Sequence, residues 1–261
     1  MSIGTWHPGN SLAHRLDPRA KVTFVALYIL ACFLVQSAPV LAVLAVAAVC
    51  VLCASGSGPR GAVSAIAPFA PLMFFVAVFD VLFASGGTEL ACAGPLSITT
   101  GGVVLAVKSV ARFACVVVGT STLMSTTSPT ALTDAAVLML RPLERVGLHT
   151  SSMSVAMGLT LRFTGVLADE LSIVREAQEL RGADFTGGVV KRLRAHVPVV
   201  IALFASAMRR SATLALAMEN RGFDPSRPRT CLRTYRLSRS DAAVLVVSVI
   251  LVALAVVDVV V

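Results

Sequence analysis

The sequence predicts an all-α membrane protein, with about five transmembrane helices and long amphipathic helices on the cytoplasmic side. Composition, the placement of charge and the length of the apolar runs carry this prediction. Of the 261 residues, 56% are hydrophobic and only 14% are charged, and the mean hydropathy is +0.85. Soluble domains carry about 25% charged residues. The composition therefore excludes an ordinary soluble protein and indicates a chain embedded in a lipid bilayer.

The positive charge of the chain is concentrated in one segment. The net charge is +8, and 16 of the 22 Lys and Arg residues lie between 125 and 240, against 9 of the 14 Asp and Glu residues. A surplus of Lys and Arg next to membrane spans marks the cytoplasmic side. The same charge suits anionic lipid or an acidic protein surface, whereas no nucleic-acid-binding motif accompanies it. We expect this segment to be cytoplasmic and to bind no nucleic acid.

Five apolar runs are long enough, or nearly long enough, to cross the bilayer. They lie at about 20–36, 39–54, 65–84, 102–124 and 242–261. A crossing helix needs about 20 residues, so the first two runs predict either two thin spans or a hairpin that enters and returns. Asp17 followed by Pro18 predicts the start of the first helix, because Asp is a good N-cap and Pro suits the first helical position.

These features divide the chain into three parts. Residues 1–124 hold an N-terminal lead-in and four spans, 125–240 form the cytoplasmic region, and 241–261 form the last span. The distribution of Lys and Arg places the N-terminus and the loop 55–62 inside. The connection 85–102 has an acidic residue and no Lys or Arg, so it is expected outside, together with the C-terminus.

Three charged residues lie within the predicted spans. Asp80 is near the outer end of the third span, and Lys108 and Arg112 are one helical turn apart on the same face of the fourth. Charges inside a bilayer are costly and are usually paired. Two interpretations stay open, namely an internal pair between Asp80 and one of the two cations, or contact with a membrane partner.

The cytoplasmic region is predicted to be a series of helices. Ser128 and Pro129 suit the N-cap and the first position of a helix. A long helix over about 152–181 has one apolar stripe and a charged opposite face, which is typical of an amphipathic helix. A Gly-rich basic linker at 183–195 follows. The apolar run Val197–Met208 is too short to cross a bilayer and is typical of a buried or interfacial helix.

One eight-residue pattern occurs twice, forty positions apart. Residues 177–184 and 217–224 both fit Ala-x-Glu-x-Arg-Gly-x-Asp. The glycine is expected to stop each helix, which places Arg181 and Arg221 at two helix ends. Helix stopping alone is one interpretation, since a cation also complements the C-terminal dipole. It does not require Glu at the same offset, so the paired match favours two equivalent contact points for a partner. The site residues predicted from the pair are Ala177, Glu179, Arg181, Gly182, Ala217, Glu219, Arg221 and Gly222.

Several motifs distributed along the chain make it resemble a known family. They are Leu16–Lys21 ahead of the first span, Thr127–Pro129 after the fourth, Arg141–Leu143, and the two Ala-x-x-x-Arg-Gly helix ends. On these motifs the chain resembles the transmembrane T component of energy-coupling factor (ECF) transporters, which are ABC-type importers of micronutrients and include cobalt/nickel and biotin systems. The twin arginine motifs are the specific part. The second motif has Arg-Gly where some members of the family have Arg-Ser.

The resemblance implies a function. Two cytoplasmic coupling helices would end in the arginine motifs, and each would dock on one of two ABC ATPase subunits through acidic residues of that subunit. The membrane part would hold a separate substrate-binding S component. The chain would then couple ATP hydrolysis to movement of the S component, and so to vitamin uptake across the cell membrane of a prokaryote. ATP and Mg would be bound by the partner ATPases, and this chain would hold no cofactor.

Three alternatives stay open. A dedicated T component of a cobalt/nickel importer would carry the same motifs, because the resemblance places cargo specificity in the S component. A secondary carrier should line its spans with charged residues, whereas here they gather in the cytoplasmic region. A membrane-embedded enzyme would need a catalytic set, yet the chain has no phosphate-binding G-x-x-x-x-G-K-[ST] motif, and its four His residues lack metal-ligand spacing. We therefore expect no catalytic site and no metal site.

Overall fold

The fold follows from a computed structural model, which describes residues 11, 14, 16–56, 58–84, 86, 88–93, 96–142, 150–224 and 238–260. The chain forms two compact units. The bundle unit comprises Met1–Ala135 and Arg233–Val261, and the crossed-helix unit comprises Ala136–Leu232. Residues 1–10 of the predicted N-terminal lead-in lie outside the described residues.

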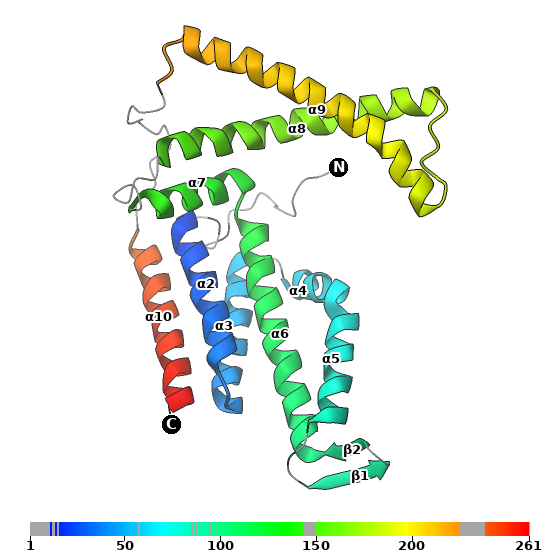
Figure 1. Ribbon diagram of the computed structural model, residues 1–261. Helices are drawn as coiled ribbons and strands as arrows, with labels where there is room; N and C mark the ends of the chain where they lie inside the picture. Colours follow the sequence, from blue (N-terminus) through cyan, green and yellow to red (C-terminus); the bar gives the residue numbers. More distant parts are fainter. Residues whose placement is uncertain are drawn as a thin grey trace. The chain divides into compact units, whose positions relative to one another are not determined.

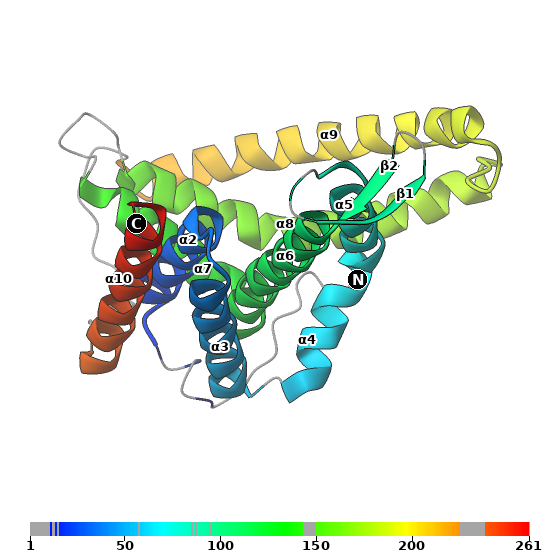
Figure 2. The ribbon, with the colours of Figure 1, turned by 90° about the horizontal axis from the view of Figure 1, so that it is seen from below.

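The bundle unit is built from helices that run side by side (Figure 1). Its helices are α2 (Pro18–Leu34), α3 (Ala38–Ser55), α4 (Gly58–Ile66), the 3-10 helix η1 (Ala67–Phe69), α5 (Ala70–Phe83), α6 (Thr100–Thr126) and α10 (Arg239–Val260). Viewed nearly along the helices, α10 and α2 lie toward one edge and α4 and α5 toward the other (Figure 2). A further helix, α7 (Pro129–Leu140), follows α6 and continues past the boundary of the unit.

Local sequence explains where several helices begin. Asp17 is the N-cap of α2 and accepts a hydrogen bond from the N–H of Arg19 at 2.9 Å, with proline at the first helical position, as the sequence predicts. The hydroxyl of Ser128 accepts from the N–H of Ala131 at 3.2 Å at the start of α7. Thr99 caps α6 in the same way, through the N–H of Gly102 at 3.1 Å.

The helices α2 and α10 are parallel, because carboxylates at the two ends of α10 bind the two ends of α2. At one end, Oδ1 of Asp241 accepts from the N–H of Asp17 at 2.8 Å. At the other, Oδ2 of Asp258 accepts from the N–H groups of Gln36 at 2.9 Å and Ser37 at 2.8 Å. A parallel pair fits a chain that crosses the membrane in alternating directions along α2, α3, α5 and α6 and crosses a fifth time along α10.

Five helices are long and apolar enough to cross a membrane by length and composition. They are Ala38–Ser55, Gly61–Phe83, Thr100–Thr126, Val189–Asn220 and Arg239–Val259. Four of these correspond to predicted spans. The 17-residue helix α2 is shorter, at about 26 Å for a rise of 1.5 Å per residue, but it lies beside α10 within the bundle unit. The apolar helix in the crossed-helix unit is longer than the 12-residue run noted in the sequence.

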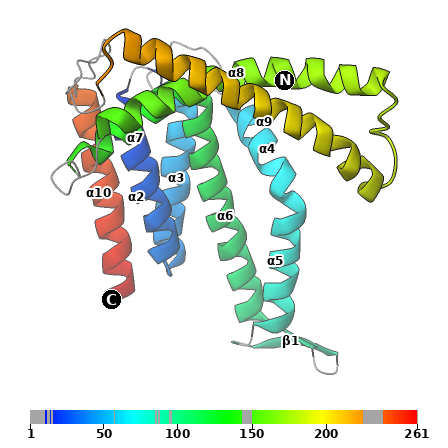
Figure 3. The same ribbon diagram turned by 45° about the horizontal axis from the view of Figure 1, so that its top comes forward.

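Two details of the bundle unit differ from the prediction. The third span begins earlier than residue 65, and its helix is interrupted by η1, where Pro68 and Pro71 lie close together. The connection expected as a loop over 85–102 contains an antiparallel hairpin of β1 (Glu89–Ala93) and β2 (Leu96–Thr99). Figure 3 shows this hairpin beyond the ends of α5 and α6. Strands this short give little periodic signal in a sequence.

The crossed-helix unit contains two long helices, α8 (Thr150–Leu180) and α9 (Val189–Asn220). The expected linker at 183–195 is shorter than predicted, because α9 begins at Val189 and is a single helix with Pro198 inside it. The basic residues assigned to the linker therefore lie in the first turns of α9. Residues 143–149, which include the end of the Arg141–Leu143 motif, lie outside the described residues.

The core of the bundle unit lies where α2, α3, α6 and α10 meet. Tyr28 of α2 is 2% exposed, and its hydroxyl donates to the carbonyl of Leu44 in α3 at 3.0 Å. A Cβ added at Gly119 of α6 would lie 3.2 Å from the Tyr28 ring, so the absence of a side chain lets α6 approach α2 closely. Small residues at such positions are typical of helix packing in membranes.

Candidate functional site: two matching helix ends

The first copy of the repeated motif ends α8 in a Schellman motif. The N–H of Gly182 donates to the carbonyl of Glu179 at 3.0 Å, and the N–H of Ala183 donates to the carbonyl of Gln178 at 3.0 Å. Gly182 has a φ of 87°, in the left-handed region that glycine adopts at low cost. Arg181 is therefore the C-cap of α8, directly before the glycine.

The second copy ends α9 with the same hydrogen bonds, each shifted by forty residues. The N–H of Gly222 donates to the carbonyl of Glu219 at 2.9 Å, and the N–H of Phe223 donates to the carbonyl of Met218 at 3.0 Å. Gly222 has a φ of 69°. Arg221 is the C-cap of α9. The two arginines thus occupy equivalent positions on two equivalent helix ends, and the glycines stop the helices as predicted.

Both helix ends are open to their surroundings. All the predicted site residues are exposed, namely Ala177, Glu179, Arg181, Gly182, Ala217, Glu219, Arg221 and Gly222. In the first copy, Glu179 forms an ion pair with Arg175 on the preceding turn at 3.1 Å. Neither Arg181 nor Arg221 forms an ion pair within the part of the chain that the structure describes. A guanidinium presented in this way can bind a carboxylate of a partner with two parallel hydrogen bonds.

The last residue of the first copy organises the turn between α8 and α9. Asp184 accepts hydrogen bonds from the N–H of Thr186 at 2.9 Å and from its hydroxyl at 2.7 Å, and it pairs with Lys191 at 3.0 Å. These hydrogen bonds, those from Thr186 foremost, hold the pKa of Asp184 well below its usual value. Asp184 therefore connects the first helix end to the start of α9.

The two long helices contact each other at equivalent positions of the repeat. Arg210 of α9 pairs with Glu170 of α8 at 3.1 Å, and the hydroxyl of Ser206 donates to the same carboxylate. Glu170 and Arg210 are themselves forty residues apart, which is the offset of the motif. This pair was not predicted, although the shared offset of forty is visible in the sequence.

The two arginines lie at equal distances along their helices from the ion pair. Arg181 lies 11 residues after Glu170, and Arg221 lies 11 residues after Arg210. At 1.5 Å per residue, each helix end is about 16 Å along its own helix from the pair. The helices cross with their C-terminal ends on opposite sides of the contact (Figures 1 and 3). The two arginine ends are therefore related by an approximate twofold rotation about the crossing point.

The two cations within the fourth predicted span bind one helix end of the bundle. Lys108 donates to the carbonyl of Gln36 at 2.9 Å, and Arg112 donates to the carbonyl of Val35. These carbonyls follow the last turn of α2, where backbone acceptors have no partner inside the helix. Among the described residues, neither cation forms an ion pair with Asp80, whose buried Oδ2 has no hydrogen-bond partner. Nearby carbonyl groups with unused acceptor capacity account for the arrangement of the two cations.

A buried polar junction lies at the opposite end of the bundle unit. Nζ of Lys21 donates to the carbonyl of Thr126 at the end of α6, at 3.2 Å. Asp241, which is 2% exposed, accepts from the N–H groups of Asp17 at 2.8 Å and Ser238 at 2.7 Å. The end of α6 and the start of α10 therefore lie at the same end of the bundle unit. Asp241 was not predicted as part of a site, although an Asp at the start of a span is an N-terminal helix signal.

The described residues contain no cluster of side chains that could bind a metal ion. No group of three or more His, Cys, Asp or Glu side chains there is placed to hold a metal ion. Lys108 and Arg112 instead bind backbone carbonyls, and Glu170 pairs with Arg210. The crossed-helix unit thus presents two exposed cationic helix ends on a crossed pair of helices.

Comparison with known proteins identifies the family. The model of the family described as "CbiQ: Cobalt transport protein" matches residues 9–232. The energy-coupling factor transporter transmembrane protein EcfT of Thermosediminibacter oceani is 34% identical over 246 residues, which cover 93% of this chain and 92% of that protein. The EcfT proteins of Listeria innocua and Bacillus subtilis are 33% identical over 247 residues and 32% identical over 255 residues. These matches cover 94% and 93% of the two chains for the former, and 97% and 96% for the latter.

The similarity extends over nearly the whole chain, and the residues that the family model matches include the positions of both arginine motifs. The T-component resemblance predicted from the motifs is thereby confirmed, as is the all-α membrane fold. The chain belongs to the CbiQ family of multi-pass membrane proteins, together with the EcfT transmembrane T components of energy-coupling factor transporters.

Proposed function

We propose that this chain is a non-catalytic coupling subunit that links ATP hydrolysis by two ATPase subunits to movement of a substrate-binding S component in vitamin uptake. Arg181 and Arg221 are the two contact points for the ATPases. ATP and Mg are bound by those partners. The bundle end that holds Lys21 and Thr126 faces the cytoplasm, in keeping with the surplus of Lys and Arg in the connected segment.

The approximate twofold relation of the two helix ends is the observation that carries this proposal. Assemblies of two homologous subunits have twofold or near-twofold symmetry. A single chain can satisfy both members of such a pair only if it presents the same contact twice in the same symmetry. The shared C-caps of α8 and α9, each 11 residues from the Glu170–Arg210 pair, meet this requirement.

The chemistry of the contact follows from the arginines. Each guanidinium is exposed at a C-cap, where it is held by a backbone fixed by three successive hydrogen bonds of the helix end. A buried carboxylate on the ATPase would bind it with charge-assisted hydrogen bonds, and loss of one partner from such a buried pair costs about 2–5 kcal/mol. The two helices are about 46–48 Å long, and as rigid bodies they would transmit a movement of the ATPases away from the contact points.

Charge reversal at the two helix ends tests the proposal. Arg181→Glu and Arg221→Glu, singly and together, are tested for co-purification with the two proposed ATPase subunits. The matched controls are Arg162→Glu on α8 and Arg209→Glu on α9, which reverse the same charge on exposed residues of the same helices away from their ends. We expect each single variant to weaken recovery of the ATPases, the double variant to abolish it, and both controls to retain it.

Two results would contradict the proposal. If the double variant recovers both ATPases at the wild-type level, the two arginines are not part of the interface. Loss of recovery in the control variants to the same degree would show that net charge, and not the helix ends, is recognised.

A labelling experiment tests the topology. A cysteine placed at Gly188, where an added Cβ meets no atom within 4 Å, should resist labelling from outside intact cells. Labelling there would overturn the cytoplasmic assignment.

A second cargo class is favoured by one observation, since the family description names cobalt transport. The names of the curated relatives state no cargo. Uptake assays in cells that carry the full transporter distinguish the two, using radiolabelled vitamins in one arm and cobalt or nickel in the other. Uptake of a vitamin that depends on this chain supports the proposed function, whereas dependence of metal uptake alone would replace it.

A further inference from the structure

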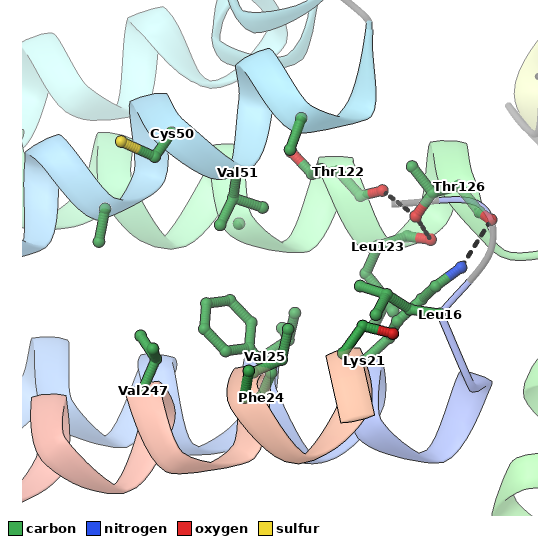
Figure 4. Close-up of a pocket in the computed structure, with 16 residues that line it drawn as sticks. Leu16, Lys21, Phe24, Val25, Cys50, Val51, Thr122, Leu123, Thr126 and Val247 are labelled. Carbon is green, nitrogen blue, oxygen red and sulfur yellow. Dashed lines mark hydrogen bonds between the residues drawn. The ribbon is translucent and has the colours of Figure 1, made fainter. Parts of the chain in front are cut away.

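A cavity of about 560 Å³ lies in the bundle unit, at the end where α2 and α10 begin and α3 and α6 end. Its volume falls within the range of about 300–1,000 Å³ that is usual for ligand sites. The walls are mostly apolar, with Phe24 of α2, Val51 of α3 and Val247 of α10 among the residues that surround it (Figure 4). None of the residues of the two arginine motifs lines it.

The cavity opens on one side, between α3 and α10. The residues that α2 and α6 contribute include the buried Phe24, Val25 and Leu123. The residues contributed by the other two helices include the exposed Cys50 and Ala243. Both α3 and α10 are long and apolar enough to cross a membrane. The open side of the cavity therefore faces whatever surrounds the spans, and in a membrane that medium is lipid.

One cation stands at the polar end of this cavity. Lys21 is 7% exposed, and its Nζ donates to the carbonyl of Thr126 at 3.2 Å and to the carbonyl of His14 at 3.5 Å. In Figure 4 the side chain of Lys21 extends along the cavity wall toward Thr126. An ammonium group has three donors, so two carbonyl acceptors leave one donor for a further oxygen. Asp17 and Asp241 attract the ammonium electrostatically but form no ion pair with it among the described residues.

The combination of an apolar cavity and one buried cation selects a class of ligand. An apolar cavity holds water poorly, because water needs two to four polar partners. An acyl chain is the apolar molecule that the bilayer supplies, and a phosphate lies at the level where its chains begin. We propose that the cavity binds one acyl chain of a membrane phospholipid, which enters between α3 and α10, and that Lys21 donates to the phosphate of that lipid.

Filling the cavity tests the first part of the proposal. Ala243 lines the cavity, whereas the neighbouring Ala242 does not, and both are exposed residues of α10. Ala243→Phe and Ala242→Phe therefore add the same ring to the same helix turn. Native mass spectrometry of the purified full chain with added dioleoyl phosphatidylglycerol should show one tightly held lipid in the wild type and in Ala242→Phe, and its loss in Ala243→Phe. Equal lipid retention by all three proteins would overturn the proposal.

Thiol labelling supplies a second measurement that needs no change in the cavity. Cys50 lines the cavity, and Cys53 lies about one turn further along α3, outside it; both are exposed, whereas Cys32 and Cys115 are buried. With Cys92 and Cys231 replaced by serine, added phosphatidylglycerol should slow maleimide labelling of Cys50 severalfold and leave Cys53 unchanged. Equal slowing at both cysteines, or none at Cys50, would contradict a lipid in this cavity.

The phosphate contact is tested by omitting the phosphate. Dioleoylglycerol has the same chains but lacks the charged phosphate. Because a hydrogen bond between charged groups contributes at least about 1.5 kcal/mol, protection of Cys50 should need at least about a tenfold higher concentration of dioleoylglycerol than of phosphatidylglycerol. Equal protection by the two lipids would refute the role of Lys21. Protection of Cys50 that occurs only in complex with the other transporter subunits, and not with lipid alone, would assign the cavity to a protein partner and refute the lipid proposal.

Discussion

Replacement of Asp241 by alanine is predicted to destabilise the bundle unit strongly. This carboxylate is 2% exposed and accepts two backbone hydrogen bonds, from Asp17 at 2.8 Å and from Ser238 at 2.7 Å. The first of these joins α10 to the start of α2 across 224 residues of sequence. Alanine removes both acceptors at once and leaves the N–H of Asp17, a residue only 7% exposed, without its partner.

The magnitude follows from the two hydrogen bonds. A hydrogen bond to a charged group contributes about 1.5–3 kcal/mol, and leaving its buried partner unsatisfied forfeits that contribution. Two such bonds predict a loss of at least about 3 kcal/mol in the free energy of unfolding. For a chain of this size, each kcal/mol lowers the melting temperature by about 2–4 °C, so Asp241→Ala should lower it by about 6–12 °C. Asp241→Asn keeps one acceptor oxygen and should fall between alanine and the wild type.

Thermal unfolding in detergent, followed by intrinsic fluorescence or by light scattering, measures the shift. The matched control is Asp258→Ala at the other end of α10, where the carboxylate also accepts two backbone N–H groups, from Gln36 and Ser37, but is accessible to water. Water can replace an exposed acceptor, so the control should shift the melting temperature clearly less. Equal shifts for the two variants, or a shift of less than about 3 °C for Asp241→Ala, would refute the argument from burial.

Two further predictions concern the crossed-helix unit. Glu170→Arg and Arg210→Glu should each weaken co-purification of the ATPases, because each breaks the contact between the two helices that sets the relation of their ends. The double variant restores a pair of opposite charges and should restore co-purification. If the double variant recovers no more ATPase than either single variant, the ion pair is excluded as the cause. Asp184→Asn should speed amide exchange at Thr186, and the ratio of the variant's exchange rate to that of the wild type at the same pH should stay constant from pH 8 to pH 5. The pKa of Asp184 is lowered from 3.8, so its contribution is complete above that value and is lost only as the pH falls below it; a ratio that shrinks between pH 7 and pH 5 would contradict this.

Local chemistry explains why the sequence predicts the helix ends well. Asp17 with Pro18, Ser128 with Pro129, and the glycines of the two motifs all act through residues within about one turn of themselves. Their hydrogen bonds appear in the structure where the sequence predicts them. The start of α9 was predicted less well, because glycines and basic residues at 187–195 are compatible with either a linker or the first turns of a helix.

Charge pairing was harder to predict than helix ends. The sequence places Asp80, Lys108 and Arg112 at similar depths, and a pair among them was one interpretation. In the structure the two cations bind the carbonyls of Gln36 and Val35 instead. Those acceptors belong to a helix end more than 70 residues away, and no local pattern indicates that this helix end lies beside α6. Whether the two cations pair with Asp80 depends on which other acceptors lie beside α6, and the sequence does not indicate those acceptors.

The sequence by itself determined the membrane class, most of the spans, the two helix ends and the family, because hydropathy, caps and motifs act over short stretches of chain. Only the tertiary structure decided that α2 and α10 are parallel, that Glu170 meets Arg210 at equivalent positions of the repeat, and that a cavity opens beside Lys21. Each of these depends on which distant helices pack together. That choice is made by side-chain packing and by long-range hydrogen bonds, and neither has a period or a spacing that a single sequence displays.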